Sequence, residues 1–457
     1  MTRPHDPHNA PPTLPAAYAS FFDLDVPAFV KRTYSPRSAW RDRPFGPRDE
    51  IFFFRGVESL SGLFTTDRDG NRGHARLPRG YLNHPRLRSA YLLYFMPLQA
   101  AKFLHLFGTH GAAIDAALAH GREHGILRVA DLGCGPGTAS IALLIALSDR
   151  VLRGDARGGI PPIELTWYDT NAAIVADGRA LLDDLLRRLA AGGFSPEVTL
   201  QVRGQPWHRA ADAPPPGGWS LALFGNVLNE DVVPDAVPTE RDLATWGRML
   251  AHVHGGGALV VEPAMKSVSQ YLSRLRDALL TAGDGAPRDK PAKAAGIPLH
   301  GPCLHAGPCP LSGGRDWCHF SVPADVPGRL YRAMSARLGS VRSWLKFSWL
   351  WMASPSAPSA VPDPASRLVI SDPLDRVTGT VLLCEPVRSS RYERVGALRL
   401  HRGDIIRIVR APSDANRSLQ GPRGPVNVSA VERNTRARRQ SRGSGGAESG
   451  ASTRGRA

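Results

Sequence analysis

The sequence lacks the features that direct a protein into or across a membrane. No run of 18 apolar residues occurs, which argues against a membrane-spanning helix. The first 20 residues are rich in Pro and His and contain no charged segment followed by an apolar one, so a secretory signal is not expected. Asp6 within this stretch also argues against a transit peptide. We therefore expect a cytoplasmic protein that does not contact membranes, and we expect a monomer.

Cysteine is scarce, with five residues in a chain of 457. An odd number in a chain of cytoplasmic type argues against a disulfide framework. Three of them, Cys303, Cys309 and Cys318, nevertheless fall within sixteen residues. Such a cluster is hard to attribute to chance.

Acidic residues are few compared with basic ones, 41 against 57, which gives a formal net charge of +16. The segment 420–457 contains eight Arg and two Glu, so it contributes +6 and the rest of the chain contributes +10. An excess of this kind favours a polyanionic partner, most simply RNA. A coding bias toward Arg is the alternative explanation.

The length allows two or three domains, and 42% apolar residues allow a sizeable core. Composition and periodicity divide the chain into five parts. These are a disordered segment at 1–20, a helical region at 21–120, an α/β domain at 121–353 with a cysteine segment at 299–320, a small β element at 365–411, and a disordered Arg-rich tail at 412–457.

Strand and helix patterns alternate between residues 127 and 285, which predicts a parallel, doubly wound sheet. Strands are expected at 127–132, 163–168, 198–202, 219–224 and 257–261, and helices at 138–152, 172–191, 240–253 and 268–280. Further strands are expected at 320–322 and 345–352, on either side of a helix at 326–338. The small β element should contain strands at 367–370, 381–383 and 396–410.

A glycine-rich turn follows the first strand, with the pattern Asp131-x-Gly133-x-Gly135-x-Gly137. A dinucleotide site would require Gly-x-Gly-x-x-Gly. The closer spacing resembles motif one of the class I S-adenosylmethionine-dependent methyltransferases, in which the loop passes close to the cofactor. That resemblance implies that Asp169, after the second strand, binds the ribose hydroxyls. The alternative is a generic Rossmann glycine turn.

Residues after the fourth strand face the methyl group and the substrate in such enzymes. Here the run is Gly225-Asn226-Val-Leu-Asn229-Glu230, and no Pro-Pro-Tyr element for amino-group methylation follows. Asn229 and Glu230 either bind substrate or cap a helix, and we identify no catalytic base. The candidate cofactor-binding residues are Asp131, Gly133, Cys134, Gly135, Gly137, Asp169 and Asn226. Within this set we interpret Cys134 as a structural residue, not a nucleophile.

Four thiols, Cys303, Cys309, Cys318 and Cys384, could close one tetrahedral metal site or hold a [4Fe–4S] cluster. Paired Cys-x-x-Cys knuckles, which zinc sites prefer, are absent, and the irregular spacing fits a cluster better. A site that combines three Cys with His305 or His319 remains open, as do buried free cysteines.

The combined motifs resemble those of the small-ribosomal-subunit methyltransferase-like proteins, known from mitochondrial ribosome assembly and with bacterial relatives. The resemblance covers residues 80–405. It is carried by the glycine turn, Leu228-Asn-Glu230, Val261-Glu-Pro263, Cys303-x-His305-x-Gly-Pro-Cys309-Pro-Leu311, Trp317-Cys-His-Phe320, Lys346-Phe-Ser348 and Cys384.

This resemblance implies S-adenosylmethionine binding and a [4Fe–4S] cluster on Cys303, Cys309, Cys318 and Cys384. It also implies attachment to small-subunit ribosomal RNA during assembly. Two alternatives are an active ribosomal-RNA methyltransferase and a small-molecule methyltransferase with a structural zinc ion.

Overall fold

The computed structural model describes residues 14–35, 38–65, 80–156, 158–230, 232–281, 298–323, 329–339, 344–354, 366–374, 381–384, 389–392, 402–409 and 430–433. Helix α1 (Ala16–Ser20) begins inside the segment predicted to be disordered, and the Tyr18 side chain is fully buried. The folded region therefore begins earlier than the sequence predicts. Most of the Arg-rich tail lies outside the described residues.

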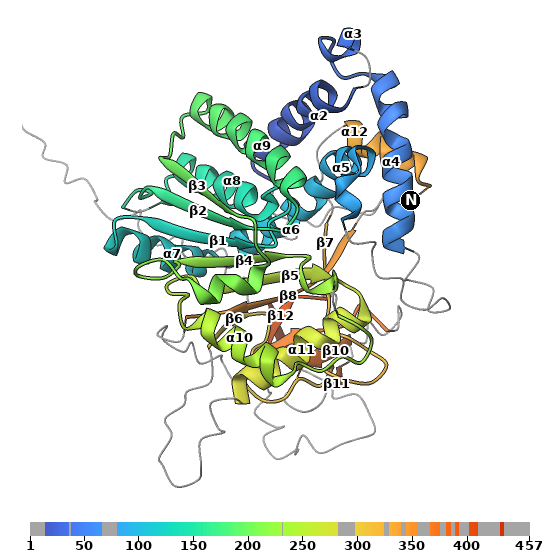
Figure 1. Ribbon diagram of the computed structural model, residues 1–457. Coiled ribbons are helices and arrows are strands. Elements are labelled where there is room, and N and C mark those ends of the chain that lie inside the picture. The colour runs from blue at the N-terminus through green and yellow to red at the C-terminus, as the bar shows by residue number, and fades with distance from the viewer. Residues whose placement is uncertain are drawn as a thin grey trace, which may run out of the picture.

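The main sheet has the strand order β3-β2-β1-β4-β5-β8-β6, and β7 also pairs with β8 (Figure 1). Strands β1 to β5 are parallel, whereas β8 runs antiparallel to β5. This mixed, mostly parallel order is typical of the class I methyltransferase fold, which confirms the predicted fold class. The strands are β1 (Leu127–Leu132), β2 (Ile163–Tyr168), β3 (Val198–Arg203), β4 (Leu221–Gly225), β5 (Ala258–Pro263), β6 (Leu299–Gly301), β7 (Phe320–Pro323) and β8 (Trp344–Met352).

Strands β6 and β7 share one edge of this sheet. Leu299 pairs opposite Met352 at one end of β8, and Phe320 pairs opposite Phe347 farther along the same strand. Residues 302–319, which carry three of the cysteines, therefore leave the sheet between two stretches of its edge. The sequence predicted the second stretch and missed the first.

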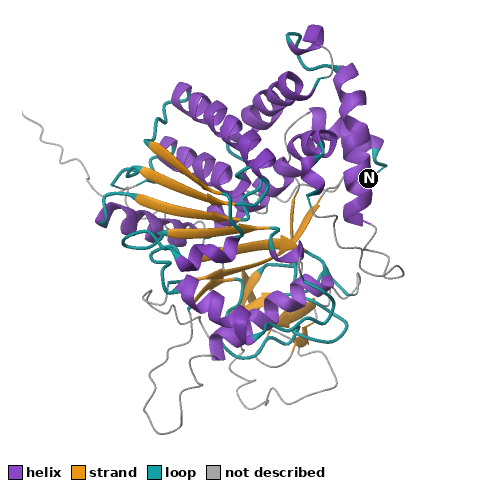
Figure 2. Ribbon diagram, in the orientation of Figure 1, coloured by secondary structure: helices purple, strands orange, loops and turns teal. Residues whose placement is uncertain are grey.

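Helices cover both faces of the main sheet (Figure 2). Alternate strand residues belong to two buried clusters, so that Leu127 and Val129 of β1 face one way, while Ala130 and Leu132 face the other. The first cluster includes the N-terminal helices and α7 to α9, and the second includes η4, α10 and α11. The helices from residue 111 onward are α7 (Gly111–Glu123), α8 (Thr138–Leu152), α9 (Ala172–Ala191), η4 (Trp207–Asp212), η5 (Leu228–Glu230), α10 (Glu240–Leu250), α11 (Lys266–Thr281) and α12 (Arg329–Arg337).

The predicted helical region before the sheet is present and packs against it. The contacts between α6 and α8 are extensive, and Tyr94 of η3 stacks on Tyr331 of α12. Among the described residues, no helix has the length and apolar character needed to cross a membrane. The elements are η1 (Phe21–Asp25), α2 (Val26–Tyr34), α3 (Ser38–Arg41), α4 (Pro47–Thr65), η2 (Tyr81–Asn83), α5 (Pro85–Ala90), η3 (Tyr91–Phe95) and α6 (Met96–Thr109).

A second, antiparallel sheet forms from the C-terminal part of the chain, with the order β11-β10-β9-β12-β13. Its strands are β9 (Ser366–Val369), β10 (Val381–Cys384), β11 (Ser389–Tyr392), β12 (Ile405–Val409) and β13 (Ala430–Arg433). Strand β13 lies within the tail predicted to be disordered. Cys384 is the last residue of β10, so the fourth predicted metal ligand belongs to this second sheet.

Candidate functional site

The glycine turn after β1 contains three residues with positive φ, Gly133, Gly135 and Gly137. A Cβ atom on Gly133 would lie 2.5 Å from the Val227 side chain, and one on Gly137 would lie 2.1 Å from Trp167. Packing inside the protein therefore requires both of these glycines. A Cβ atom on Gly135 would meet nothing within 4 Å, so this residue borders empty space. The turn thus exposes its backbone at one point.

The empty space is a pocket at the carboxyl ends of β1 and β4, where open α/β sheets bind ligands. Its walls come from the turn, from the start of α8, from the residues after β4 and from the N-terminal region. The lining residues are Tyr91, Gln99, Phe103, Asp131, Gly133, Cys134, Gly135, Thr138, Ala139, Gly225 and Asn226. Five of the seven predicted cofactor-binding residues line the pocket, whereas Gly137 and Asp169 do not. Asp169 contacts the pocket-lining Gly135.

Asp169 lies just after β2, and its carboxylate accepts hydrogen bonds from the backbone N–H of Gly135 (2.8 Å) and of Asn171 (2.8 Å). Burial raises the pKa of the Asp169 carboxyl, and the backbone donors oppose that shift. The acid therefore fixes the turn beside the pocket. A carboxylate has about four acceptor sites, so it keeps capacity for a ligand hydroxyl.

Asp131 is buried at the end of β1, where Oδ2 accepts from the backbone N–H of Ser140 (3.0 Å) and from its hydroxyl (2.7 Å). The Trp167 indole N–H donates to the same hydroxyl oxygen (2.9 Å). Burial raises the pKa of the Asp131 carboxyl to about 7. This side chain joins β1, β2 and α8, which is a structural task that the motif alone does not reveal.

Asn226 follows β4 in the left-handed region, with φ of 56°. Non-glycine residues rarely adopt this conformation, although Asn does so more readily than most. Its Oδ1 atom is buried and has no hydrogen-bond partner among the described residues. Because Asn226 lines the pocket, this acceptor is available to a ligand with a polar hydrogen.

Glu262 is fully buried at the end of β5, and the sequence did not single it out as a site residue. Its carboxylate accepts from the backbone N–H groups of Val227 (2.9 Å), Leu228 (2.8 Å) and Asn229 (3.2 Å). Burial raises the pKa of the Glu262 carboxyl to about 7. Glu262 therefore holds the loop that carries Asn226. The sequence feature that could have identified Glu262 is an acid at the end of a strand predicted to be buried.

Asn229 and Glu230, for which the sequence left two roles open, differ in their surroundings. With its amide oriented to suit its neighbours, Asn229 donates to the Asn226 carbonyl (2.6 Å) and to Glu262 (3.2 Å), so it braces the loop. Glu230 is exposed. The pKa of the Tyr91 hydroxyl is raised by burial and then by the nearby Glu230 carboxylate. Glu230 therefore faces the part of the pocket wall that the N-terminal region supplies.

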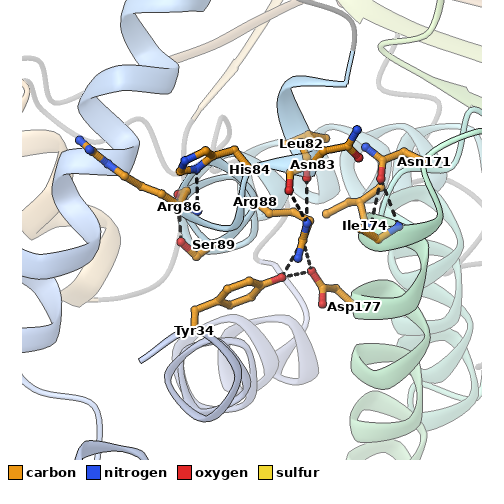
Figure 3. Close-up of polar contacts among 11 residues, drawn as sticks. Tyr34, Leu82, Asn83, His84, Arg86, Arg88, Ser89, Asn171, Ile174 and Asp177 are labelled. Carbon is orange, nitrogen blue, oxygen red and sulfur yellow. Dashed lines mark hydrogen bonds and ion pairs between the residues drawn. The ribbon is translucent and has the colours of Figure 1, made fainter. Parts of the chain in front are cut away.

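An ionic network fixes that N-terminal wall on α9 (Figure 3). Arg88 of α5 donates from Nε to Asp177 (2.9 Å) and to the Tyr34 hydroxyl (2.8 Å), and from a second nitrogen to the Asn83 carbonyl (3.0 Å). Both members of the Arg88–Asp177 pair are largely buried. Gly178, the next residue, lies so close to the glycine turn that a Cβ atom would be 2.5 Å from the Pro136 backbone. The network therefore joins η3, which carries Tyr91, to the glycine turn.

The four cysteines of the predicted metal set lie near one another. The pKa of the Cys318 thiol is raised well above its usual range, first by burial and then by Cys303, Cys309 and Cys384. None of these cysteines forms a disulfide. Cys134 is separate from them, and burial raises the pKa of its thiol well above the usual range. An inert, buried thiol at this position fits the structural role predicted for it.

His305 is the histidine of the segment that contacts a cysteine directly. Its Nε2 lies 3.3 Å from the Cys384 sulfur, and its Nδ1 lies 3.0 Å from the Gly307 carbonyl oxygen. Because a carbonyl only accepts, Nδ1 carries the proton and Nε2 presents its lone pair to the thiol. Such an imidazole is correctly oriented either to accept the thiol proton or to bind a metal.

Helix α11 and strand β8 hold the cysteine segment in place. Arg276 is buried and donates to the carbonyls of Gly307 (2.6 Å) and His305. Asp277 accepts from the backbone N–H of Cys309 (2.9 Å). From β8, the Ser348 hydroxyl donates to the Cys318 carbonyl (2.8 Å). The backbone of the segment is therefore fixed on both sides of its cysteines.

Within the described residues, which include all four of these cysteines, no group of three or more His, Cys, Asp or Glu side chains is arranged to hold a metal ion. The thiols are gathered but do not converge on a single point. Burial raises the pKa of the Cys303 thiol to about 11 and also raises that of Cys309. The buried Arg276 cation opposes both shifts, because an adjacent positive charge stabilises the ionised form. The donor set fits a thiolate-bound group, whereas the arrangement does not fit one ion.

No protein-family model and no curated protein sequence matches the chain. Among solved structures, the chain is similar to a loganic acid methyltransferase with SAH, at 12% identity over 42% of this chain and 65% of that one, with a TM-score of 0.25. It is also similar to an O-methyltransferase family protein from Burkholderia thailandensis, at 12% identity over 66% and 72% of the two chains, with a TM-score of 0.27. A third structure, a Burkholderia thailandensis protein bound to S-adenosyl-homocysteine, has 14% identity over 49% and 66% and a TM-score of 0.23.

The chain thus spans slightly less than two thirds of the loganic acid methyltransferase. TM-scores this low mark a remote likeness. The fold assignment therefore rests on the strand order and pairing of this chain, and what those proteins bind belongs to them.

Proposed function

We propose that this chain binds S-adenosylmethionine in the pocket beside Gly135. The observation that carries this proposal is the open space at Gly135, because the two neighbouring glycines are explained by packing and this one is not. The unpaired Asn226 oxygen and the Asp169 carboxylate flank the same space. Together they supply the acceptors that a ligand with an ammonium group and ribose hydroxyls needs.

S-adenosylmethionine, when bound, supplies an activated methyl group. The residues of this chain bind and orient it: Asp169 accepts ribose hydroxyls, and Asn226 accepts a polar hydrogen. The titratable side chains that line the pocket are Tyr91, Asp131 and Cys134. Burial raises the pKa of each, so Tyr91 and Cys134 stay protonated at neutral pH. The Asp131 carboxyl, with a pKa of about 7, is held by the backbone and the hydroxyl of Ser140. The pocket is therefore better equipped for cofactor binding than for proton abstraction.

Titration calorimetry with S-adenosylhomocysteine tests this proposal. Gly135→Val should abolish binding, because the new side chain occupies the open space and a β-branched residue is strained at positive φ. Gly154→Val is the matched control, since Gly154 also has positive φ and open surroundings but lies at the far end of α8. Equal affinity in wild type and Gly135→Val would refute the assignment of the pocket.

The second part of the proposal is a [4Fe–4S] cluster on Cys303, Cys309, Cys318 and Cys384. The four thiols lie near one another, and thiolates are the ligands that such a cluster requires. Iron, sulfide and zinc analysis of anaerobically purified protein distinguishes the cluster from a zinc site, and zinc without iron would refute the cluster.

The third part is a partner, small-subunit ribosomal RNA, bound during ribosome assembly or translation. It is supported by the net charge of +16 and by the resemblance carried by the cysteine segment. The alternatives are an active ribosomal-RNA methyltransferase and a small-molecule methyltransferase with a structural zinc ion. Incubation of labelled cofactor with small subunits, RNA or cell extract separates them: transfer to RNA or to a metabolite would identify the corresponding enzyme, and binding without transfer supports the assembly role.

A further inference from the structure

One face of α4 remains uncovered although the rest of the helix is pinned to its neighbours. Lys31 of α2 forms a buried ion pair with Asp49 (2.7 Å). Gly56 packs so closely on α5 that a Cβ atom would lie 2.5 Å from the Arg86 carbonyl. The Arg337 guanidinium of α12 lies 5.9 Å from the centre of the Phe54 ring. These contacts fix the helix and determine which side chains point outward.

The uncovered face carries Arg48, Ile51, Phe52 and Arg55, which follow the spacing of one helical face. Ile51 is 53% exposed and Phe52 is 42% exposed, so two large apolar side chains lie next to each other at the surface. Trp40 of α3 stands edge-on to Phe52, with ring centres 6.4 Å apart. Figure 1 places α3 and α4 at the end of the molecule away from the main sheet.

The charges of this face are mostly positive, because Arg48 and Arg55 share it with one exposed acid, Glu58. Arg43, exposed between α3 and α4, and the two arginines of α4 take part in none of the ion pairs between described residues. The acids of the first turn of α4, Asp49 and Glu50, are buried on the opposite side. We call Trp40, Arg43, Arg48, Ile51, Phe52 and Arg55 the α4 face.

We propose that the α4 face binds single-stranded RNA, with its arginines on phosphates and Phe52 stacked on a base. This inference rests on the proposed RNA-binding function and locates it. Proteins that bind single strands combine guanidinium groups along the backbone with exposed aromatic rings under the bases. A membrane is a poorer occupant, because a membrane-surface helix presents a continuous apolar face and here arginines flank only two apolar side chains.

The test is fluorescence anisotropy of the full chain with a labelled single-stranded oligouridylate over a range of salt concentrations. Arg48→Gln/Arg55→Gln should weaken binding and lower the slope of log affinity against log salt by about 1.4, the value for two lost phosphate contacts on a single strand. Phe52→Ala should weaken binding about fivefold or more, with little change in that slope.

Arg241→Gln/Arg248→Gln on α10 is the matched control, since it removes the same charge from two exposed positions seven residues apart on another helix. Circular dichroism melting verifies that all variants fold. Crosslinking to 4-thiouridine RNA adds a second measurement, in which the crosslinked peptide should contain Phe52.

Failure of the wild-type chain to bind RNA would defeat the RNA part of the proposed function. RNA binding that is equally weakened by the α10 control, or crosslinks found only outside the α4 face, would defeat this inference alone. Binding of the chain to anionic vesicles that Phe52→Ala abolishes, while RNA affinity stays unchanged in that variant, would also overturn it.

Discussion

Glycine is required at the three positions of the glycine turn for different physical reasons. Gly133 and Gly137 avoid collisions with Val227 and Trp167, whereas Gly135 keeps a space open. A sequence pattern gives all three the same weight. Only the packing around each residue separates a glycine required by the fold from one, such as Gly135, that is available to a ligand.

Glu262 offers a prediction at the scale of one residue. Burial raises its pKa from 4.5 to about 7, so the folded protein holds the proton that the unfolded chain releases above pH 4.5. The stabilising effect of this protonation is complete below about pH 4.5 and is lost as the pH rises to 7, at a cost of up to about 3 kcal/mol. Glu262→Gln cannot ionise, so its urea stability should fall less between pH 5 and pH 7.5 than that of wild type.

Asp131 titrates over the same range, with its pKa raised to about 7, and should leave a residual pH dependence in this variant. Glu240→Gln, which removes an exposed carboxyl on α10, should keep the full wild-type dependence. If Glu262→Gln and wild type lose stability in parallel across this range, the carboxyl of Glu262 is already ionised in the folded protein at pH 5.

At the scale of elements, the parallel strands and the helices between them were predictable because periodicity and turn residues agree there. Helices α8 and α9 match their predicted bounds, and the glycine turn marks the junction of β1 with α8. Strand β6 was missed because it has only three residues and pairs with β8, which lies far along the chain. Glu262 was missed as a site residue because its three backbone donors come from another loop.

Helix α11 gives a prediction about one element acting on another. Removing Arg276 leaves the carbonyls of His305 and Gly307 without a donor and Asp277 without its nearest cation. Breaking a buried charged contact of this kind costs about 3–5 kcal/mol. Arg276→Leu should therefore speed hydrogen exchange in 303–318, while exchange in β1 to β5 changes little.

Arg248→Leu on α10 serves as the control, because this arginine is exposed and lies on the neighbouring helix. Unchanged exchange in 303–318 after loss of Arg276 would mean that other contacts, such as Ser348 on the Cys318 carbonyl, suffice to hold the segment.

At the scale of the whole molecule, the four cysteines come from two parts of the fold. Cys303, Cys309 and Cys318 lie between two stretches of the main sheet's edge, and Cys384 ends a strand of the second sheet. Protein contacts between these parts include the Arg402 side chain, which donates to the carbonyls of His319 (3.3 Å) and Ile370. A cluster on the four thiols would add a covalent connection, and its binding energy would then contribute to folding of the second sheet.

Cys309→Ser tests that connection. Loss of one ligand should abolish the brown colour and the visible absorbance of anaerobically purified protein, and hydrogen exchange in β9, β10 and β12 should become faster. Affinity for S-adenosylhomocysteine should persist, because the pocket is built from β1, β4, α8 and the N-terminal region. The Cys134→Ser variant should retain the iron of the wild-type protein, since Cys134 lies in the glycine turn and not among the four thiols. Retained visible absorbance in Cys309→Ser, or exchange that is faster throughout β1 to β5, would refute a cluster that specifically joins the second sheet to the first.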